Sequence, residues 1–120
     1  MTRKARIMTF VGLGMVLATL ALAGAFYNNG AVNPTSGYAN TTLFTYTVCY
    51  QLSDGQSAPD AYVDIYRGST LWDSRMMAFL IINRIVYYTY TTTLPAGGNY
   101  GFLFRTFDDS TDLTSGPTVS

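Results

Sequence analysis

The chain has 120 residues, with seven Lys and Arg against seven Asp, no Glu and no His. The absence of His excludes a Ser-His-Asp triad, a Cys-His dyad and a His-rich zinc site. A single cysteine, Cys49, excludes an internal disulfide and a cysteine cluster for a metal. The balanced charge gives no sign of a nucleic-acid partner, and none is predicted.

The charges are divided unevenly along the chain. Arg3, Lys4 and Arg6 lie in the first six residues, whereas residues 24–120 hold four Arg, no Lys and all seven Asp. Four positive and seven negative charges give this second part a net charge of −3. The sequence therefore predicts a short basic and apolar leader followed by a mildly acidic body.

The leader has the three-part layout of a secretory signal peptide. After the basic start comes an uncharged apolar run, and Ala21 and Ala23 then supply the small residues that a signal-peptidase site needs at its −3 and −1 positions. We therefore predict a signal peptide over residues 1–23.

A retained membrane anchor is the alternative for the same segment. The apolar stretch over residues 7–26 is about long enough for a single helix to span a bilayer core of ~30 Å. In either case the basic end stays cytoplasmic and the body is exported. We expect a secreted or cell-surface, extracytoplasmic location, with membrane contact only through residues 7–26 if the leader is not cleaved.

The first part of the body combines an irregular segment with a clear strand. Residues 24–40 are rich in Asn, Gly, Pro and Ser, which predicts a linker or an irregular first strand. Residues 41–52 predict a strand, because large apolar side chains alternate there with mainly hydroxyl-bearing ones. The apolar face of this strand consists of Phe44, Tyr46, Val48 and Tyr50.

The middle of the body predicts three more strands. Residues 61–67 form one, with Val63 and Ile65 on its apolar face, and residues 71–74 form a short edge strand. The run from Met76 to Ile82 is continuously apolar, so its periodicity does not distinguish a strand from a helix. We predict a buried strand there, because the segment that follows is plainly a strand.

The last part continues in the same way. Residues 84–94 and 100–105 alternate as strands do, residues 108–112 predict a loop, and residues 113–119 predict a last strand or an exit segment. Short strands at roughly ten-residue spacing, with turn signals between them, are typical of an antiparallel β-sandwich. We assign this domain to residues 41–120.

Two features resemble fibronectin type III and related immunoglobulin-like domains. Residues 94–100, Leu-Pro-Ala-Gly-Gly-Asn-Tyr, resemble the turn before a late strand in those domains. Tyr100 would then hold the place of the tyrosine whose hydroxyl bonds back to the upstream backbone. The wider pattern over residues 32–120 resembles the modules strung along secreted and cell-surface proteins of bacteria and archaea, in which a Gly-Pro-x-Val segment like residues 116–119 often leads into the next copy.

This resemblance implies a fold class and an arrangement. The fold is an all-β, immunoglobulin-like antiparallel β-sandwich, preceded by a signal peptide or by a single membrane-spanning helix. The chain would be one bead of a longer multi-module protein. The first loop of such modules often binds calcium, but here only Asp54 remains in its core.

Few residues of the body offer chemistry. Asp108, Ser110 and Asp112 alternate like the first ligands of many calcium loops and form a candidate calcium site; no other cofactor is predicted. Asn40 begins an N-x-[ST] triplet and is a candidate glycosylation site. Asp108 and Asp109 are candidates for the paired carboxylates of a glycosidase, but neighbours in a loop usually point apart. No enzyme is therefore predicted.

The sequence thus predicts an exported, non-catalytic module with a structural or adhesive role at the cell surface. Its expected partners are other cell-surface modules, copies of itself joined through edge strands that lack Lys, or carbohydrate stacked on exposed tyrosines. The alternative function is a single-pass, membrane-anchored accessory or sensor protein with an extracytoplasmic β-sandwich domain.

Overall fold

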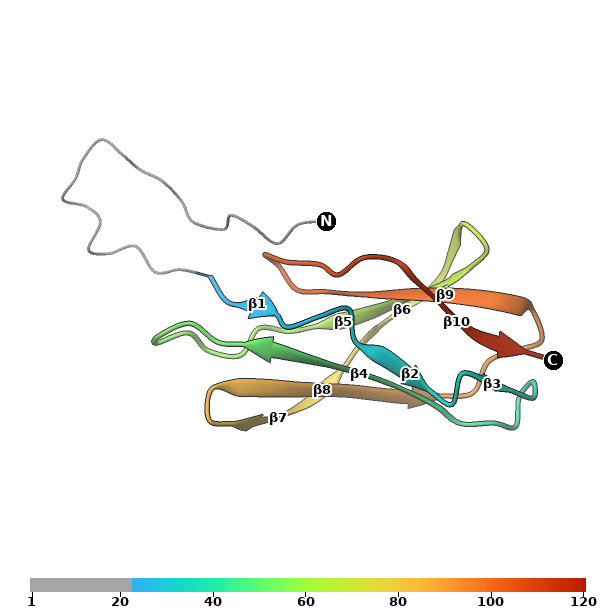
Figure 1. Ribbon diagram of the computed structural model, residues 1–120, viewed down its shortest axis with the longest axis horizontal. Coiled ribbons are helices and arrows are strands. Elements are labelled where there is room, and N and C mark those ends of the chain that lie inside the picture. Colours follow the sequence, from blue (N-terminus) through green and yellow to red (C-terminus); the bar gives the residue numbers. More distant parts are fainter. Residues whose placement is uncertain (1–22) are drawn as a thin grey trace.

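The computed structural model describes residues 23–120, so the predicted signal peptide lies outside the described residues except for Ala23. The described residues form ten β-strands in two five-stranded sheets, with no helix among them. The prediction of an all-β fold is confirmed, and the two layers are consistent with a β-sandwich (Figure 1). Residues 23–120 contain no helix long and apolar enough to cross a membrane.

The first sheet has the strand order β1-β4-β8-β7, and β2 also pairs with β4. All of its pairings are antiparallel. Its strands are β1 (Ala25–Phe26), β2 (Ala31–Asn33), β4 (Phe44–Gln51), β7 (Ala78–Ile82) and β8 (Ile85–Thr92).

The second sheet has the strand order β3-β10-β9-β5-β6. Its pairings are antiparallel except that β3 runs parallel to β10. Its strands are β3 (Ser36–Gly37), β5 (Tyr62–Arg67), β6 (Thr70–Met76), β9 (Gly98–Arg105) and β10 (Thr114–Val119). Residues 24–40 thus contribute β1 and β2 to one sheet and β3 to the other.

The core lies between the sheets and is built from one face of each long strand. The predicted apolar face of β4 is buried over its whole length, and so are Val63 and Ile65 of β5. Tyr46 of β4 meets Phe102 of β9 edge to face, with ring centroids 5.5 Å apart, so aromatic side chains join the two layers. The alternation found in the sequence therefore selects the buried faces correctly.

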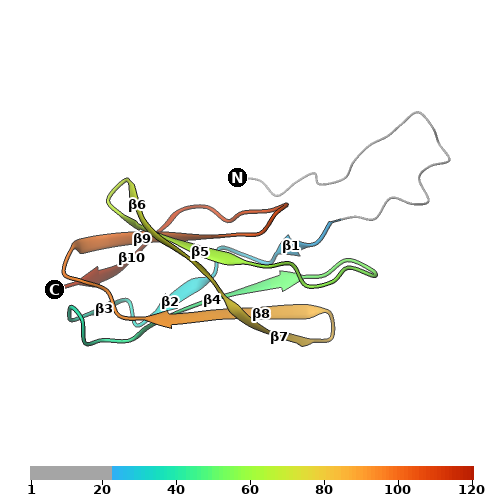
Figure 2. The same cartoon turned by 180° about the vertical axis from the view of Figure 1, so that it is seen from behind.

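The prediction of a buried strand over Met76–Ile82 is wrong for most of that run. Met77 is buried, and its amide donates to the Ala61 carbonyl over 2.9 Å, but all five residues of β7 are exposed. The path of the chain explains this exposure. β6 leads directly into β7 and carries the chain from one sheet to the other (Figure 2). β7 then joins the first sheet at its outer edge, beyond β8, where all of its residues stay exposed.

Two buried tyrosines of the core allow a test of how much a hydrogen-bonded hydroxyl contributes to the stability of the fold. The Tyr88 hydroxyl donates to the Pro59 carbonyl, whereas the Tyr46 hydroxyl has no hydrogen-bond partner among the described residues. We expect Tyr88→Phe to lower the free energy of unfolding by about 1–2 kcal/mol, because it leaves a buried carbonyl unpaired. Tyr46→Phe should change it by less than about 0.5 kcal/mol or raise it. Urea denaturation measures both, and equal losses would contradict the assignment.

Candidate functional site: a groove between two loops

A groove of about 570 Å³ lies between the loop that follows β4 and the loop that follows β9. We call it the inter-loop groove. Its volume falls within the range of about 300–1,000 Å³ that is usual for ligand sites. It is lined by Gln56, Ser57, Ala58, Pro59, Asp60, Tyr62, Arg105, Thr106 and Phe107.

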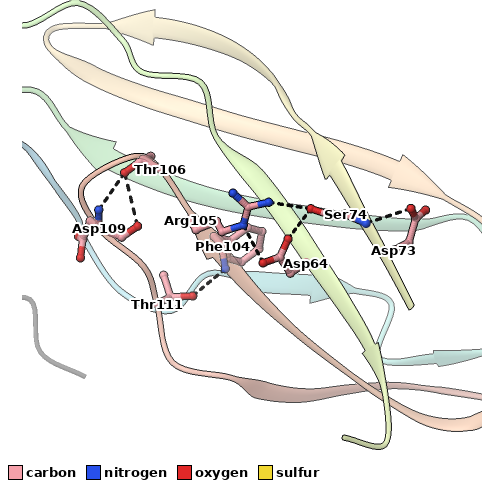
Figure 3. A network of polar contacts seen from close by, with 8 residues as sticks. All are labelled: Asp64, Asp73, Ser74, Phe104, Arg105, Thr106, Asp109 and Thr111. Atoms are coloured by element: carbon pink, nitrogen blue, oxygen red, sulfur yellow. Dashed lines mark hydrogen bonds and ion pairs between the residues drawn. The ribbon is translucent and has the colours of Figure 1, made fainter. Parts of the chain in front are cut away.

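Arg105, at the end of β9, is held in place by two neighbouring strands (Figure 3). Its Nε lies 2.8 Å from Oδ2 of Asp64 on β5, and its Nη2 donates to Oγ of Ser74 on β6 over 2.9 Å. Ser74 Oγ in turn donates to Asp64 Oδ1 over 2.6 Å. Asp64 is almost completely buried, and a buried carboxylate is costly unless it is paired and hydrogen-bonded in this way.

Aromatic side chains complete this wall of the groove. The guanidinium carbon of Arg105 lies 4.6 Å from the ring centroid of Tyr62, which is within the range of a cation–π contact. Phe107 is 81% exposed and stands at the start of the adjoining loop. The groove therefore contains the Arg105 cation, which Asp64 and Ser74 hold in place, and the Tyr62 ring in contact with it. It also contains the Phe107 ring, which is open to solvent.

The loop after β9 is stabilised by its own hydroxyl and carboxylate groups. Thr106 Oγ1 donates to Asp108 Oδ1 over 2.9 Å and accepts from the Asp109 amide over 3.2 Å. Thr111 Oγ1 accepts from the Phe104 amide over 2.9 Å. These bonds, some of which are drawn in Figure 3, give the loop a defined shape although it contains no regular strand.

The two adjacent carboxylates of this loop have different partners. Asp108 Oδ1 also accepts from the Tyr50 hydroxyl over 3.2 Å, whereas Asp109 Oδ2 accepts from the Phe26 amide over 3.0 Å. Asp109 Oδ1 accepts from the Ser110 amide over 2.9 Å. Each carboxylate thus has a structural role within the loop, with Asp108 tied to β4 and Asp109 to β1.

The Tyr50 hydroxyl is a hydrogen-bond donor in this network. Burial raises the pKa of Tyr50 to about 12, although the hydrogen bond that Gln56 donates to its oxygen acts in the opposite direction. The negative charge of Asp108 raises the pKa further. At neutral pH the phenol therefore stays protonated and donates to Asp108.

The candidate calcium residues have separate contacts. Asp108 faces Tyr50 and Thr106, Ser110 forms an isolated antiparallel bridge with Arg105, and the Asp112 amide donates to Asn29 Oδ1 over 3.1 Å. Within residues 23–120 no group of three or more Asp, Glu, Cys or His side chains is arranged to hold a metal. The calcium site stays a prediction.

Tyr100 and Asn40 contact neighbouring carbonyls before β9, and neither residue lines the inter-loop groove. The Tyr100 hydroxyl donates to the Pro95 carbonyl, five residues upstream, over 2.5 Å. Asn40 is exposed in the loop before β4, and its amide donates to the Leu94 carbonyl over 2.9 Å. Its glycosylation stays a prediction.

Sequence reasoning misses the groove because the groove depends on contacts between distant segments. Arg105 and Asp64 are 41 residues apart, and nothing in either local pattern indicates that they pair. Phe107 follows the alternating residues of its strand and has no pattern of its own. One signal was available, since Arg105 is one of only four cations in residues 24–120 and adjoins the loop with the most Asp.

Comparison with known proteins does not assign a function to the chain. No model of a protein family matches it, and no curated protein is found to be similar. The groove, the loops and the exposed edges are therefore the basis for inferring a function.

Two Asp→Asn changes compare the contribution of the Asp64–Arg105 ion pair to stability with that of an exposed ion pair. Asp64→Asn removes the charge that faces Arg105, whereas Asp73→Asn removes one that faces the exposed Arg75 at 2.8 Å. We expect Asp64→Asn to lower the free energy of unfolding by about 1–3 kcal/mol, which is below the value for a fully buried pair because Arg105 is partly exposed. Asp73→Asn should cost less than about 0.5 kcal/mol. Equal effects in denaturant titrations would contradict this account.

Proposed function

We propose that this chain is an exported, non-catalytic module with an immunoglobulin-like fold and a structural or adhesive role at the cell surface. The observation that carries the proposal is the strand order. The first sheet, β1-β4-β8-β7, matches the order A-B-E-D of an immunoglobulin-like sandwich. The second, β10-β9-β5-β6, matches G-F-C-C′.

Two further details support the same fold. The first strand is divided between the two sheets, since β1 and β2 pair with β4 whereas β3 pairs with β10. The hydrogen bond from Tyr100 to the Pro95 carbonyl is of the kind made by the tyrosine corner of these domains.

An adhesive role is supported by the position of the inter-loop groove. In the proposed fold, its two loops correspond to the B–C and F–G loops, which in variable immunoglobulin domains belong to the binding end. Loops held by a rigid scaffold commonly carry the binding residues of a domain. The Arg105 network fixes one wall of the groove to such a scaffold.

A sugar of a surface polysaccharide is the ligand class that we propose for the groove. The exposed ring of Phe107 can stack on the apolar face of a sugar, and the exposed side chains of Ser57 and Asp60 offer hydrogen bonds beside it. Two observations favour binding over catalysis: the sequence lacks His, and the adjacent Asp108 and Asp109 bind separate protein donors.

A membrane-anchored accessory or sensor protein is the second candidate. It is favoured by the uncharged apolar segment over residues 7–26. Because Ala25 and Phe26 belong to β1, the spanning part would be residues 7–24, which at about 1.5 Å per residue is close to the thickness of a bilayer core. The extracytoplasmic domain and its groove would be the same in both cases.

The fate of the leader distinguishes the two candidates. We expect the exported protein to begin at Gly24. A start at Phe26 is also compatible with cleavage, because Ala23 and Ala25 supply small residues at the −3 and −1 positions of a second site. N-terminal sequencing and the intact mass of the protein recovered outside the cytoplasm measure this. A start at Met1 or Thr2 in a membrane fraction would instead support the anchored form.

The groove is tested by replacing its exposed ring. Phe107→Ser should weaken binding to purified envelope polysaccharide by about tenfold, since a stacked aromatic contributes on the order of 1 kcal/mol or more. Tyr38→Ser is the matched control, because Tyr38 is 70% exposed compared with 81% for Phe107 and does not line the groove. Equal binding by the two variants in a titration would contradict the assignment.

A further inference from the structure

β7 has a property that the proposed function does not explain. All five of its residues are exposed, and four of them, residues 79–82, are large and apolar. β7 is the last strand of its sheet, so its outer edge is unpaired among the described residues. An uncharged apolar edge strand is a template on which another strand can pair.

The turn after β7 determines which backbone groups face outward. Asn83 and Arg84 both have positive φ, of 50° and 66°, as the two central residues of a type I′ hairpin turn do. In such a hairpin the closing pair, Ile82 and Ile85, is hydrogen-bonded, and hydrogen-bonded pairs then alternate along the ladder. The amides and carbonyls of Phe79 and Ile81 therefore point away from β8.

No charge protects this edge from pairing. β7 itself contains no charged residue, and the cation nearest to it in the sequence, Arg84, contacts the loop after β4. Its Nη1 lies 2.9 Å from Asp54 Oδ1, and its Nη2 donates to the Leu52 carbonyl over 3.1 Å. Inward-pointing charges and edge lysines, the usual barriers to association, are both missing from β7.

We propose that β7 pairs antiparallel with β7 of a second copy of this chain, about a twofold axis at Leu80. In this register Phe79 forms hydrogen-bonded pairs with Ile81 of the second copy, which uses the outward-facing groups of both strands. Leu80 lies opposite its own counterpart, and the two first sheets join into one continuous sheet. This inference goes beyond the proposed function, because it depends neither on export nor on the groove.

The exposed apolar area agrees with a dimer of this kind. The exposed fractions of residues 79–82 and of Tyr87, which neighbours Leu80 on β8, correspond to about 500 Å² per protomer, or at most about 1,000 Å² in a symmetric pair. Pairing at the edge covers the flanks of these side chains and leaves the two sheet faces open, so the buried area is at the low end for specific interfaces. We therefore expect a weak, reversible dimer that depends on concentration.

Cysteine cross-linking tests the register. In a Cys49→Ser background, Leu80→Cys places two thiols opposite each other across the proposed axis, where a disulfide fits a pair of facing strand residues. Thr89→Cys is the control, because Thr89 is exposed on β8, one strand farther from the axis. The exported protein should form disulfide-linked dimers with Leu80→Cys under mild oxidation and not with Thr89→Cys. Equal rates of cross-linking would overturn the proposal.

A charge at the axis tests the association itself. Leu80→Lys sets two like charges against each other, and we expect the dimer dissociation constant to rise at least tenfold by sedimentation equilibrium. Leu43→Lys is the matched control, because Leu43 is 62% exposed and Leu80 is 61% exposed. Unchanged sedimentation in both variants would overturn the proposal. A second outcome would also overturn it. If Leu80→Lys alone lost binding to lipid vesicles while its sedimentation stayed the same, the edge of β7 would be assigned to a membrane.

Discussion

In a fold of two facing sheets, each strand can bury only one of its two faces against the core, because successive side chains point to opposite sides. β4 meets this constraint fully, since its large apolar side chains lie on one face and its hydroxyls and other smaller groups lie on the other. The same holds for β8, where Val86 and Tyr88 are buried and Tyr87 is exposed. The position of the core between the sheets follows from this division.

Two places depart from the constraint, and each corresponds to a proposed interaction. On β5, the face away from the core carries Asp64, which is buried all the same because Ser74 and Arg105 of the neighbouring strands enclose it. On β7, both faces are apolar and all five residues stay exposed, although Phe79 contacts the ring of Tyr88. The first departure fixes a wall of the inter-loop groove, and the second produces the edge that we assign to a second copy.

The sequence is sufficient to predict the features that depend on local alternation. The buried face of β4, the apolar side of β5 and the all-β class all follow from a period of two residues. The hydroxyl of Tyr100 makes a contact that a local turn motif also indicates, because donor and acceptor are five residues apart.

Other features depend on which strands become neighbours, and local alternation does not contain that information. The apolar run at residues 76–82 favours burial by its composition, but the chain changes sheets at Met77 and leaves β7 at an edge. The local sequence places Asp64 on the face of β5 away from the core and does not indicate that it is buried. Its burial depends on Ser74 and Arg105, which come from two other strands. The groove requires two loops about fifty residues apart to meet, which the pairing of β5 with β9 brings about.

The proposed dimer requires that the edge of β7 be unpaired in the single chain and paired in the dimer. Amide hydrogen exchange at Phe79 and Ile81, followed over a range of protein concentrations, measures both states. The proposed pairing predicts rapid exchange in dilute protein and protection that increases with concentration at these two amides. Exchange that stays equally rapid at all concentrations, or protection that does not change on dilution, would contradict it.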